Sequence, residues 1–290
     1  MTTEGADPRF VDIDGWPVAD AVAAMADAQG RAVAALSPAL PALSAAAEAG
    51  AARLARGGRL AYAGAGTSGR LAVQDGVELT PTYDWPDDRL VFLLAGGAAA
   101  MMRGIEGAED DADAARAAVA GAGLGGDDVL VAVAASGRTP YTRAAVAAAR
   151  AAGALTIAIA NNPGAPLLDD ADHAVVLDTG AEVVAGSTRM QAGTAQKAAL
   201  NILSTAMMLR LGRVYRGRMV AMRATNAKLR ARAVAMVAGL ATVDPPAAEA
   251  ALVATGWSVR AAVLVAGGAT PDEAQARLDR AGGDLRRALG

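Results

Sequence analysis

The chain has 290 residues, of which 53% are hydrophobic, and it carries a formal net charge of -3 and no cysteine. This length and apolar content can fill the core of one large domain with a smaller one beside it. The balanced charge lacks the basic field that holds a nucleic-acid backbone, so no nucleic-acid partner is expected. With no cysteine and the single His173, a disulfide, a thiol nucleophile, a metal site and a bound cofactor are not expected either.

The beginning of the chain predicts a cytoplasmic location. Glu4, Asp7 and Arg9 stand where a secretory signal would have a basic segment followed by an apolar one. The most apolar long stretch, residues 198–209, is shorter than the roughly 20 residues that a membrane span requires. We therefore interpret it as a buried helix and expect no membrane partner.

In chain order, the first pattern is helical. Residues 17–55 show apolar residues at helical spacing, with a break near Pro38 and Pro41, which predicts two helices. Apolar strand-like runs follow, with helical stretches between most of them, at residues 59–66, 89–96, 129–135, 155–160 and 174–178, the last with His173 beginning an edge strand. Continuous apolar strands that alternate with helices indicate an α/β fold, a parallel sheet covered on both faces in a three-layer α/β/α arrangement.

The last part of the chain is helical. Long helices are predicted over residues 190–211 and about 219–240. After them, residues 244–263 align without a gap on residues 270–289, which lie 26 positions later. Such a repeat of short helices, each followed by glycine, indicates a small separate module. The expected division is a helical segment at 1–57, a central α/β domain at 58–240 and a C-terminal helical module at 241–290.

Three loops combine hydroxyl groups with a basic residue, and they are the candidate ligand site. Two of them follow predicted strands and lead into helices, where hydroxyls and unpaired backbone amides together bind an anion. The expected ligand is a small phosphorylated metabolite. The candidate residues are Gly66, Thr67, Ser68 and Arg70 in the first loop, Ser136, Gly137, Arg138 and Thr139 in the second, and Ser187, Thr188 and Arg189 in the third.

The first loop also matches a dinucleotide fingerprint. Residues 64–69 read G-x-G-x-x-G after a strand and before a helix. The second predicted strand, however, ends in Leu94-Ala95-Gly96-Gly97, where a dinucleotide-binding fold would place an acidic residue for the ribose. Phosphate binding without a nucleotide is the favoured interpretation.

Two glutamates are candidate site residues, each with an alternative. Glu78 closes the helix that begins at the first loop, just before Pro81, which we expect to turn the chain, and it is either a solvated residue or a site residue. Glu109 belongs to an acidic cluster at residues 106–111 that could simply complement a helix dipole. Arg70, Arg138 and Arg189 are likewise either surface charges or contacts to phosphate.

Six stretches resemble those of the N-acetylmuramic acid 6-phosphate etherase family, in the same order and over essentially the whole chain. They are AGAGTSGRL (63–71), EGAED (106–110), AASGRTPY (134–141), GSTRM (186–190), AGTAQK (192–197) and ATNAKL (224–229). The resemblance implies a sugar isomerase (SIS) fold and a homodimer with sites near the subunit interface. It also implies removal of D-lactate from N-acetylmuramic acid 6-phosphate, a step in cell-wall sugar recycling that leaves N-acetylglucosamine 6-phosphate.

The resemblance places the two catalytic glutamates of the family on Glu78 and Glu109. Our hypothesis is that Glu109 removes a proton and Glu78 protonates the departing lactate. This chain has Leu79-Thr80 where the family usually has Cys-Pro, and Asn161 where it has Cys, so neither cysteine can be needed here. It also has Gly76-Val77 in place of the usual Ala-Ser.

Other functions remain open at this point. The glucokinase regulatory protein shares this architecture and senses sugar phosphates without cleaving them, and a sugar-phosphate isomerase would need only proton transfer between adjacent carbons. A structural protein without a ligand is a third alternative, which the convergence of hydroxyl loops at strand ends disfavours.

Overall fold

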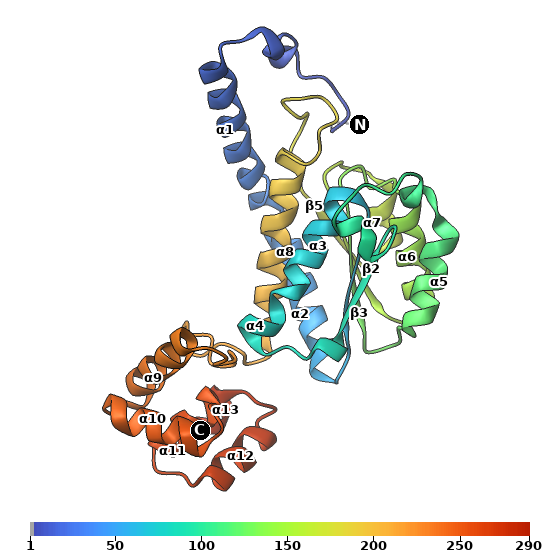
Figure 1. Cartoon of the computed structure of the whole chain (residues 1–290). Helices are drawn as coiled ribbons and strands as arrows, with labels where there is room; N and C mark the ends of the chain where they lie inside the picture. Colours follow the sequence, from blue (N-terminus) through green and yellow to red (C-terminus); the bar gives the residue numbers. More distant parts are fainter. Residues whose placement is uncertain (1–2) are drawn as a thin grey trace. The chain divides into compact units, whose positions relative to one another are not determined.

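The computed structural model describes residues 3–290 of the chain (Figure 1). Its contacts separate two compact units. The sheet unit comprises residues 3–76 and Asp88–Ala206, and the helical unit comprises Val77–Asp87 and Met207–Gly290. Residues 207–240, which the sequence interpretation assigned to the central domain, therefore lie with the C-terminal helices. The domain division expected from the sequence stays a prediction.

The sheet unit contains five parallel strands in the order β2-β1-β3-β4-β5. This confirms the predicted α/β fold, with His173 at the start of the edge strand. Each strand lies within two residues of its expected bounds. The strands are β1 (Leu60–Gly64), β2 (Leu90–Leu94), β3 (Val129–Ala134), β4 (Leu155–Ala160) and β5 (His173–Val176).

Helices cover both faces of the sheet, which is why β1, β3 and β4 are buried along their whole length. Figure 1 shows α5 (Ala112–Ala122) and α6 (Pro140–Ala151) on one face. On the other lie α2 (Leu40–Ala55), α3 (Gly66–Val77) and α8 (Gln191–Arg210). The long helix α1 (Val18–Ala34) and the short helix α7 (Pro166–Asp170) also belong to this part of the chain. Single 3-10 turns lie at Pro8–Phe10, Ile13–Gly15, Ser37–Ala39, Asp87–Arg89, Ala98–Met101 and Ala108–Asp110.

The expected helix break near Pro38 is confirmed, because Ser37–Ala39 forms a separate turn between α1 and α2. Within the described residues, Val18–Ala55 is also the stretch that is long and apolar enough to resemble a membrane span. Its second half, α2, packs against β3, β4 and β5 as a core helix.

Two predicted features near the helical unit were wrong in detail. Pro81 does not turn the chain, because it is accommodated within the short helix α4 (Leu79–Tyr83), which ends instead at Asp84 with φ 52°. The helix expected from about residue 219 begins only at α9 (Ala227–Ala241), where the Asn226 side chain accepts the amide N–H of Leu229 at 2.9 Å. A capping side chain fixes a helix start more sharply than apolar spacing does.

The C-terminal repeat is confirmed helix by helix. The first copy forms α10 (Pro245–Ala254) and α11 (Val259–Ala266), and the second forms α12 (Pro271–Arg280) and α13 (Leu285–Leu289). The α10 and α12 bounds coincide under the 26-residue offset, and Gly256 and Gly282 hold the same left-handed backbone at φ 59° and 65°. The repeat packs with α9 around one apolar core, so it is a real structural unit.

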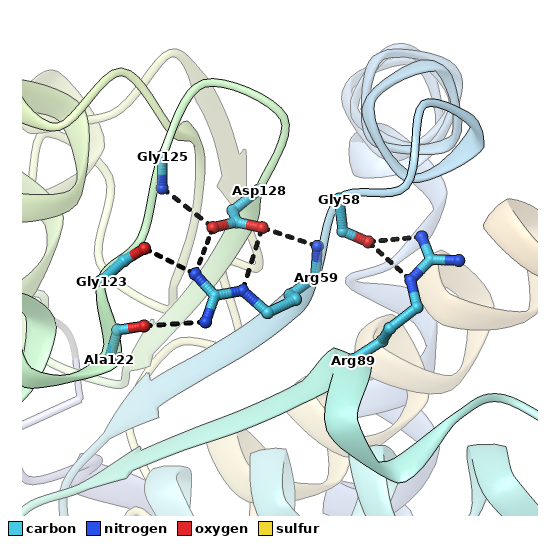
Figure 2. A network of polar contacts seen from close by, with 7 residues as sticks. All are labelled: Gly58, Arg59, Arg89, Ala122, Gly123, Gly125 and Asp128. Carbon is cyan, nitrogen blue, oxygen red and sulfur yellow. Dashed lines mark hydrogen bonds and ion pairs between the residues drawn. The ribbon is translucent and has the colours of Figure 1, made fainter.

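A polar network fixes the amino ends of β1 and β3 (Figure 2). The Asp128 carboxylate accepts the backbone N–H of Arg59 at 2.7 Å, its guanidinium Nη2 at 2.7 Å and the amide of Gly125 at 2.8 Å. Arg59 also donates to the carbonyls of Ala122 and Gly123, both at 2.7 Å, where α5 ends. The network sets the relative position of the two strands whose opposite ends carry the hydroxyl loops.

Gly76, which stands where the resembling family usually has alanine, has a steric role in this chain. A Cβ atom at this position would lie 2.5 Å from Cε1 of Phe92 and 2.9 Å from Cε2 of Tyr62. These rings stack on each other with centroids 6.0 Å apart. Glycine therefore allows α3 to lie closely on β1 and β2 in this chain.

Candidate functional site

A cavity of about 410 Å³ opens at the carboxyl ends of β1 and β3. These strands are neighbours, with Gly64 in register with Val133, and β2 continues the sheet on the far side of β1. The chain order therefore changes direction here, and open α/β sheets bind ligands at such a switch point. The lining comes from all three hydroxyl loops and two other segments: Glu4, Ala65, Gly66, Thr67, Ser68, Glu109, Asp110, Ala134, Ala135, Ser136, Arg138, Thr139, Pro140 and Thr188.

The first loop brings the beginning of α3 to the cavity. Gly66, with φ 54°, starts the helix, and Thr67 and Ser68 occupy its first turn. A Cβ atom on Gly69 would lie 2.7 Å from the carbonyl oxygen of Gly64, so glycine lets the helix start directly against β1. The helix N-terminus and two hydroxyls consequently face the same space, which suits an anion.

The second loop contributes in the same way at β3. Gly137 turns the chain with φ 63°, and a Cβ there would meet Cβ of Ala165 at 2.5 Å. The Ser136 hydroxyl accepts the amide of Arg138 at 3.2 Å. Thr139 is the N-cap residue of α6, so a second helix N-terminus faces the cavity. Gly137 shapes the loop without lining the cavity.

From the third loop, Thr188 alone lines the cavity. Its carbonyl accepts the amide of Gly193 at 2.9 Å, and a Cβ on Gly193 would lie 3.6 Å from Thr67 Cγ2, which brings this loop beside the first one. The buried Glu182 carboxylate accepts the amides at the start of α8, both at 2.9 Å, so this helix N-terminus already has its anion. Ser187 and Arg189 are not among the lining residues, and their assignment stays a prediction.

The loop arginines differ in their contacts. Arg138 is exposed and lines the cavity. Arg70 instead braces a neighbouring loop, since its Nε donates to the carbonyl of Ala100 at 2.8 Å and its Nη2 to that of Arg103 at 3.1 Å. It lines an adjoining cavity of about 420 Å³ that shares Thr67 and Glu109 with the first. Binding of phosphate by Arg70 stays a prediction.

Glu109 lies in the cavity, on the 3-10 turn Ala108–Asp110 between β2 and α5. The alternative interpretation was that this acidic cluster complements a helix dipole at the helix N-terminus. Asp111 performs that task, because its carboxylate accepts the amide of Ala114 at 2.8 Å. Glu109 is therefore exposed toward both adjoining cavities, where a carboxylate can act on a ligand.

Glu78 belongs to the helical unit. It is exposed and precedes α4 as its N-cap residue, without a side-chain capping bond. The described residues that line the two adjoining cavities do not include it. Its catalytic role stays a prediction.

Sequence reasoning missed Glu4 as a lining residue. Asn162 holds the preceding residue, Thr3, which is fully buried: Thr3 donates its amide N–H to Asn162 Oδ1 at 3.2 Å, and Asn162 Nδ2 donates to the Thr3 hydroxyl at 2.7 Å. The same Nδ2 donates to the carbonyl of Ala135 at 3.0 Å, just before the second loop. These bonds fix Thr3, and with it the adjacent Glu4, beside the cavity. A long-range pair of this kind leaves no periodic signal in a sequence.

Asn161, which stands where the resembling family has cysteine, is a structural residue. It is fully buried, donates to the carbonyl of Leu177 at 3.1 Å and accepts from Gln196 at 2.8 Å. Across residues 3–290, no three His, Asp or Glu side chains converge as metal ligands would. The cavity lining offers hydroxyls, two helix N-termini, carboxylates and the Arg138 guanidinium.

Proteins from several bacteria are similar to this chain along its whole length. The chain is 52% identical over 289 residues to the N-acetylmuramic acid 6-phosphate etherase of Deinococcus radiodurans, covering 99% of this chain and 95% of the relative. It is 45% identical to the protein of that name from Streptomyces avermitilis, covering 100% and 93%. The corresponding values for Cronobacter sakazakii are 42%, 100% and 98%.

Family models and solved structures agree on the fold. The model of the N-terminal SIS domain of the glucokinase regulatory protein matches residues 43–150, and the general SIS domain model matches residues 112–206. A candidate phosphosugar isomerase involved in capsule formation, from Bacteroides fragilis, superposes with a TM-score of 0.52 at 24% identity, covering 67% of this chain and 91% of that one. A candidate sugar-phosphate isomerase from Listeria monocytogenes gives 0.50 at 19%, covering 71% and 92%.

Proposed function

Because the chain belongs to the N-acetylmuramic acid 6-phosphate etherase family of SIS-domain proteins, we propose that it cleaves the D-lactyl ether of N-acetylmuramic acid 6-phosphate. The products are N-acetylglucosamine 6-phosphate and D-lactate, so the enzyme is a carbon-oxygen lyase of cell-wall sugar recycling. The observation that carries this conclusion is identity of 41–52% to etherases along the full chain. The cavity at β1 and β3 has the donors that a sugar phosphate requires.

We assign the phosphate to the hydroxyl loops. Thr67, Ser68, Ser136 and Thr139 surround the cavity together with the starts of α3 and α6. Hydroxyls and helix N-termini hold a phosphate dianion without a metal and without a nucleotide. The rest of the sugar then extends toward Glu109, which lines the same cavity.

The reaction we propose is an elimination followed by addition of water. In the open-chain sugar, the aldehyde acidifies the proton on the adjacent carbon, C2, and the Glu109 carboxylate takes that proton. The electron pair forms a C2–C3 double bond as the C3–O bond breaks, and Glu78 gives its proton to the departing lactate oxygen. Water then adds at C3 and a proton returns to C2, which restores both glutamates.

Replacing the loop hydroxyls should weaken substrate binding more than it slows chemistry. For Ser136→Ala and Thr67→Ala, each missing hydrogen bond to a charged phosphate should raise KM about tenfold, with a smaller change in kcat. Steady-state kinetics of lactate release measures this, with the exposed Ser44→Ala on α2 as the control. An unchanged KM in both loop variants would contradict the phosphate assignment.

We further propose a cytoplasmic homodimer with its sites near the interface. The support for a dimer is the family resemblance and the apolar outer face of α1, where Val18 and Val22 are 79% and 54% exposed. Burial of that face against a second copy removes apolar surface from water. Light scattering should give twice the mass of one chain, and a fully active monomer would contradict the proposal.

Product analysis separates this function from its rivals. Incubation with N-acetylmuramic acid 6-phosphate should release D-lactate and N-acetylglucosamine 6-phosphate in equal amounts. A ketose without lactate would indicate a sugar-phosphate isomerase. Thermal stabilisation by the sugar phosphate without any product would indicate a sensor like the glucokinase regulatory protein, whose domain model matches residues 43–150.

A further inference from the structure

The helical unit contains a cavity of its own, of about 430 Å³, which the proposed reaction does not use. It lies between the end of α4, the segment before α9 and the turn that joins α10 to α11. Its lining residues are Asp84, Val220, Ala221, Met222, Arg223, Ala224, Thr225, Arg230, Gly256, Trp257, Ser258, Val259 and Arg260. The lining includes Ala224 and Thr225, the first two residues of the ATNAKL stretch, which has no part in the sheet-unit cavity.

The charge of this lining is strongly one-sided. Three arginines, Arg223, Arg230 and Arg260, face a single lining carboxylate, Asp84. Asp84 is already paired with Arg223, which also feels the more distant charge of Asp87. The cavity therefore has two lining guanidinium groups that Asp84 does not neutralise by pairing.

A fourth arginine adds to the excess. Arg213 donates to the carbonyls of Tyr83 and Asp84 at 3.4 and 3.3 Å. Burial lowers the pKa of both Arg213 and Arg260, and the charge of Arg213 lowers the pKa of Arg260 further, against the opposing effect of Asp84. Partly dehydrated cations that repel one another are stabilised when an anion binds between them.

The internal repeat offers a comparison within the same chain. At the start of α13, the Asp284 carboxylate accepts the amides of Arg286 and Arg287 at 2.8 and 3.3 Å. The equivalent residue at the start of α11 is Ser258, whose neutral hydroxyl accepts the amide of Ala261 at 3.3 Å. In the second copy, the Asp284 carboxylate therefore lies at the N-terminus of α13. In the first copy, the N-terminus of α11 lies at the basic cavity with a neutral hydroxyl in place of that carboxylate.

Trp257 gives the cavity an aromatic wall at a conformational cost. Trp257 adopts a left-handed backbone with φ 66°, which is unfavourable for any residue that has a Cβ atom. The equivalent residue of the second copy is Gly283, with φ 80°. Both residues make the same backbone bond, to Leu252 at 2.7 Å and to Leu278 at 2.8 Å. The Trp257 indole carries the Arg230 guanidinium 4.8 Å from its centroid, which holds that charge at the cavity.

We propose that this cavity is a second anion site, which binds the phosphate or carboxylate group of a small molecule between Arg230, Arg260 and the start of α11. The carbon part of the ligand packs on Trp257 and on the apolar side chains of Val220 and Met222. None of its lining residues lines the cavity at β1 and β3.

Calorimetric titration with inorganic phosphate at constant ionic strength tests this. The full-length chain carries Thr67→Ala and Ser136→Ala as the starting background, so that the sheet-unit cavity contributes little heat. Arg230→Gln removes one lining charge without disturbing the pair of Arg223 with Asp84. Ser258→Asp copies Asp284 and places a carboxylate where the ligand anion would bind. Arg232→Gln, an exposed arginine on the same helix that does not line the cavity, is the matched control.

We expect saturable phosphate binding in the background chain and in the Arg232→Gln control. The Kd for phosphate should rise about tenfold or more in Arg230→Gln, because that change removes a charge-assisted contact. It should rise similarly in Ser258→Asp, because the new carboxylate occupies the place of the anion. Repeating the titration with D-lactate distinguishes a carboxylate ligand from a phosphate ligand. No saturable binding of either probe, or binding that is equal in all four proteins, would overturn the proposal. Thermal unfolding of each variant verifies that it is folded.

Discussion

Replacing Glu109 by Gln should lower the kcat of lactate release by about a thousandfold, because a positioned general base contributes on the order of 10² to 10⁴ in rate. Gln has nearly the same shape but cannot accept the C2 proton. Glu109 suits this task by position, since it lines the cavity while Asp111 caps α5 in its place. Single-turnover or steady-state assays of D-lactate measure the effect.

The control for this variant is Glu106→Gln. Glu106 is an exposed carboxylate on the same loop that lines only the adjoining cavity. It should retain wild-type kcat within about twofold, since surface charges away from the reacting atoms have small effects. Normal turnover in Glu109→Gln would remove this residue from the mechanism.

The same assay run in deuterated water assigns the two glutamates. If Glu109 is the base and Glu78 only the acid, Glu78→Gln should still exchange the C2 proton of the substrate with solvent while it fails to release lactate. Glu109→Gln should lose both activities. If only Glu109→Gln retained solvent exchange of the C2 proton, Glu78 would be the base and Glu109 the acid.

Replacing Asp128 by Ala should lower the free energy of unfolding by about 2 kcal/mol. The loss is smaller than for a fully buried pair, because the side chain of Arg59, which loses its carboxylate partner, is 29% exposed. The side chain of Asp128 is 9% exposed, and its carboxylate holds Arg59 and Gly125 at the amino ends of β1 and β3 (Figure 2). Urea denaturation followed by circular dichroism measures the loss. The neighbouring Asp127, whose pair with Arg56 is about half exposed on both sides, is the matched control, with an expected cost below about 1 kcal/mol.

The effect of Asp128 should depend on pH in a defined direction. Burial alone would raise the pKa of Asp128, but the hydrogen bonds from Arg59 and Gly125 and the charge of Arg59 together lower it below 3.8. The folded protein therefore binds this proton less readily than the unfolded chain. The stabilisation is fully present above about pH 4 and is lost as the pH falls through the folded pKa. A difference between wild type and Asp128→Ala that grows as the pH falls below 4 would contradict this assignment.

The sequence predicted the sheet and the loops at its edge because these depend on local patterns. An apolar run followed by glycine and hydroxyl residues marks a strand end and a helix start wherever the sheet places it. The order of strands then brings the loops after β1 and β3 together. Contacts between distant residues could not be predicted in this way. The hydrogen bond from Asn162 to Thr3 and the one from Arg70 to the carbonyl of Ala100 are examples, because neither follows from the spacing of residues in the sequence.

Helix ends also explain where the sequence interpretation was incomplete. The third loop resembles the other two in composition, but Glu182 occupies the N-terminus of α8, nine residues before Gln191. The start of α9 depended on the Asn226 cap rather than on the apolar pattern from residue 219. In both cases one side chain that accepts a backbone amide decides the structure, and composition alone does not identify it.

The most direct test of the whole account is D-lactate release from N-acetylmuramic acid 6-phosphate, compared with release from unphosphorylated N-acetylmuramic acid by the same purified protein. The account predicts release from the phosphorylated sugar, and a kcat/KM for the unphosphorylated sugar that is lower by several orders of magnitude, because the hydroxyl loops would lose their anion. Absence of lactate from the phosphorylated sugar, or equal release from both sugars, would contradict it.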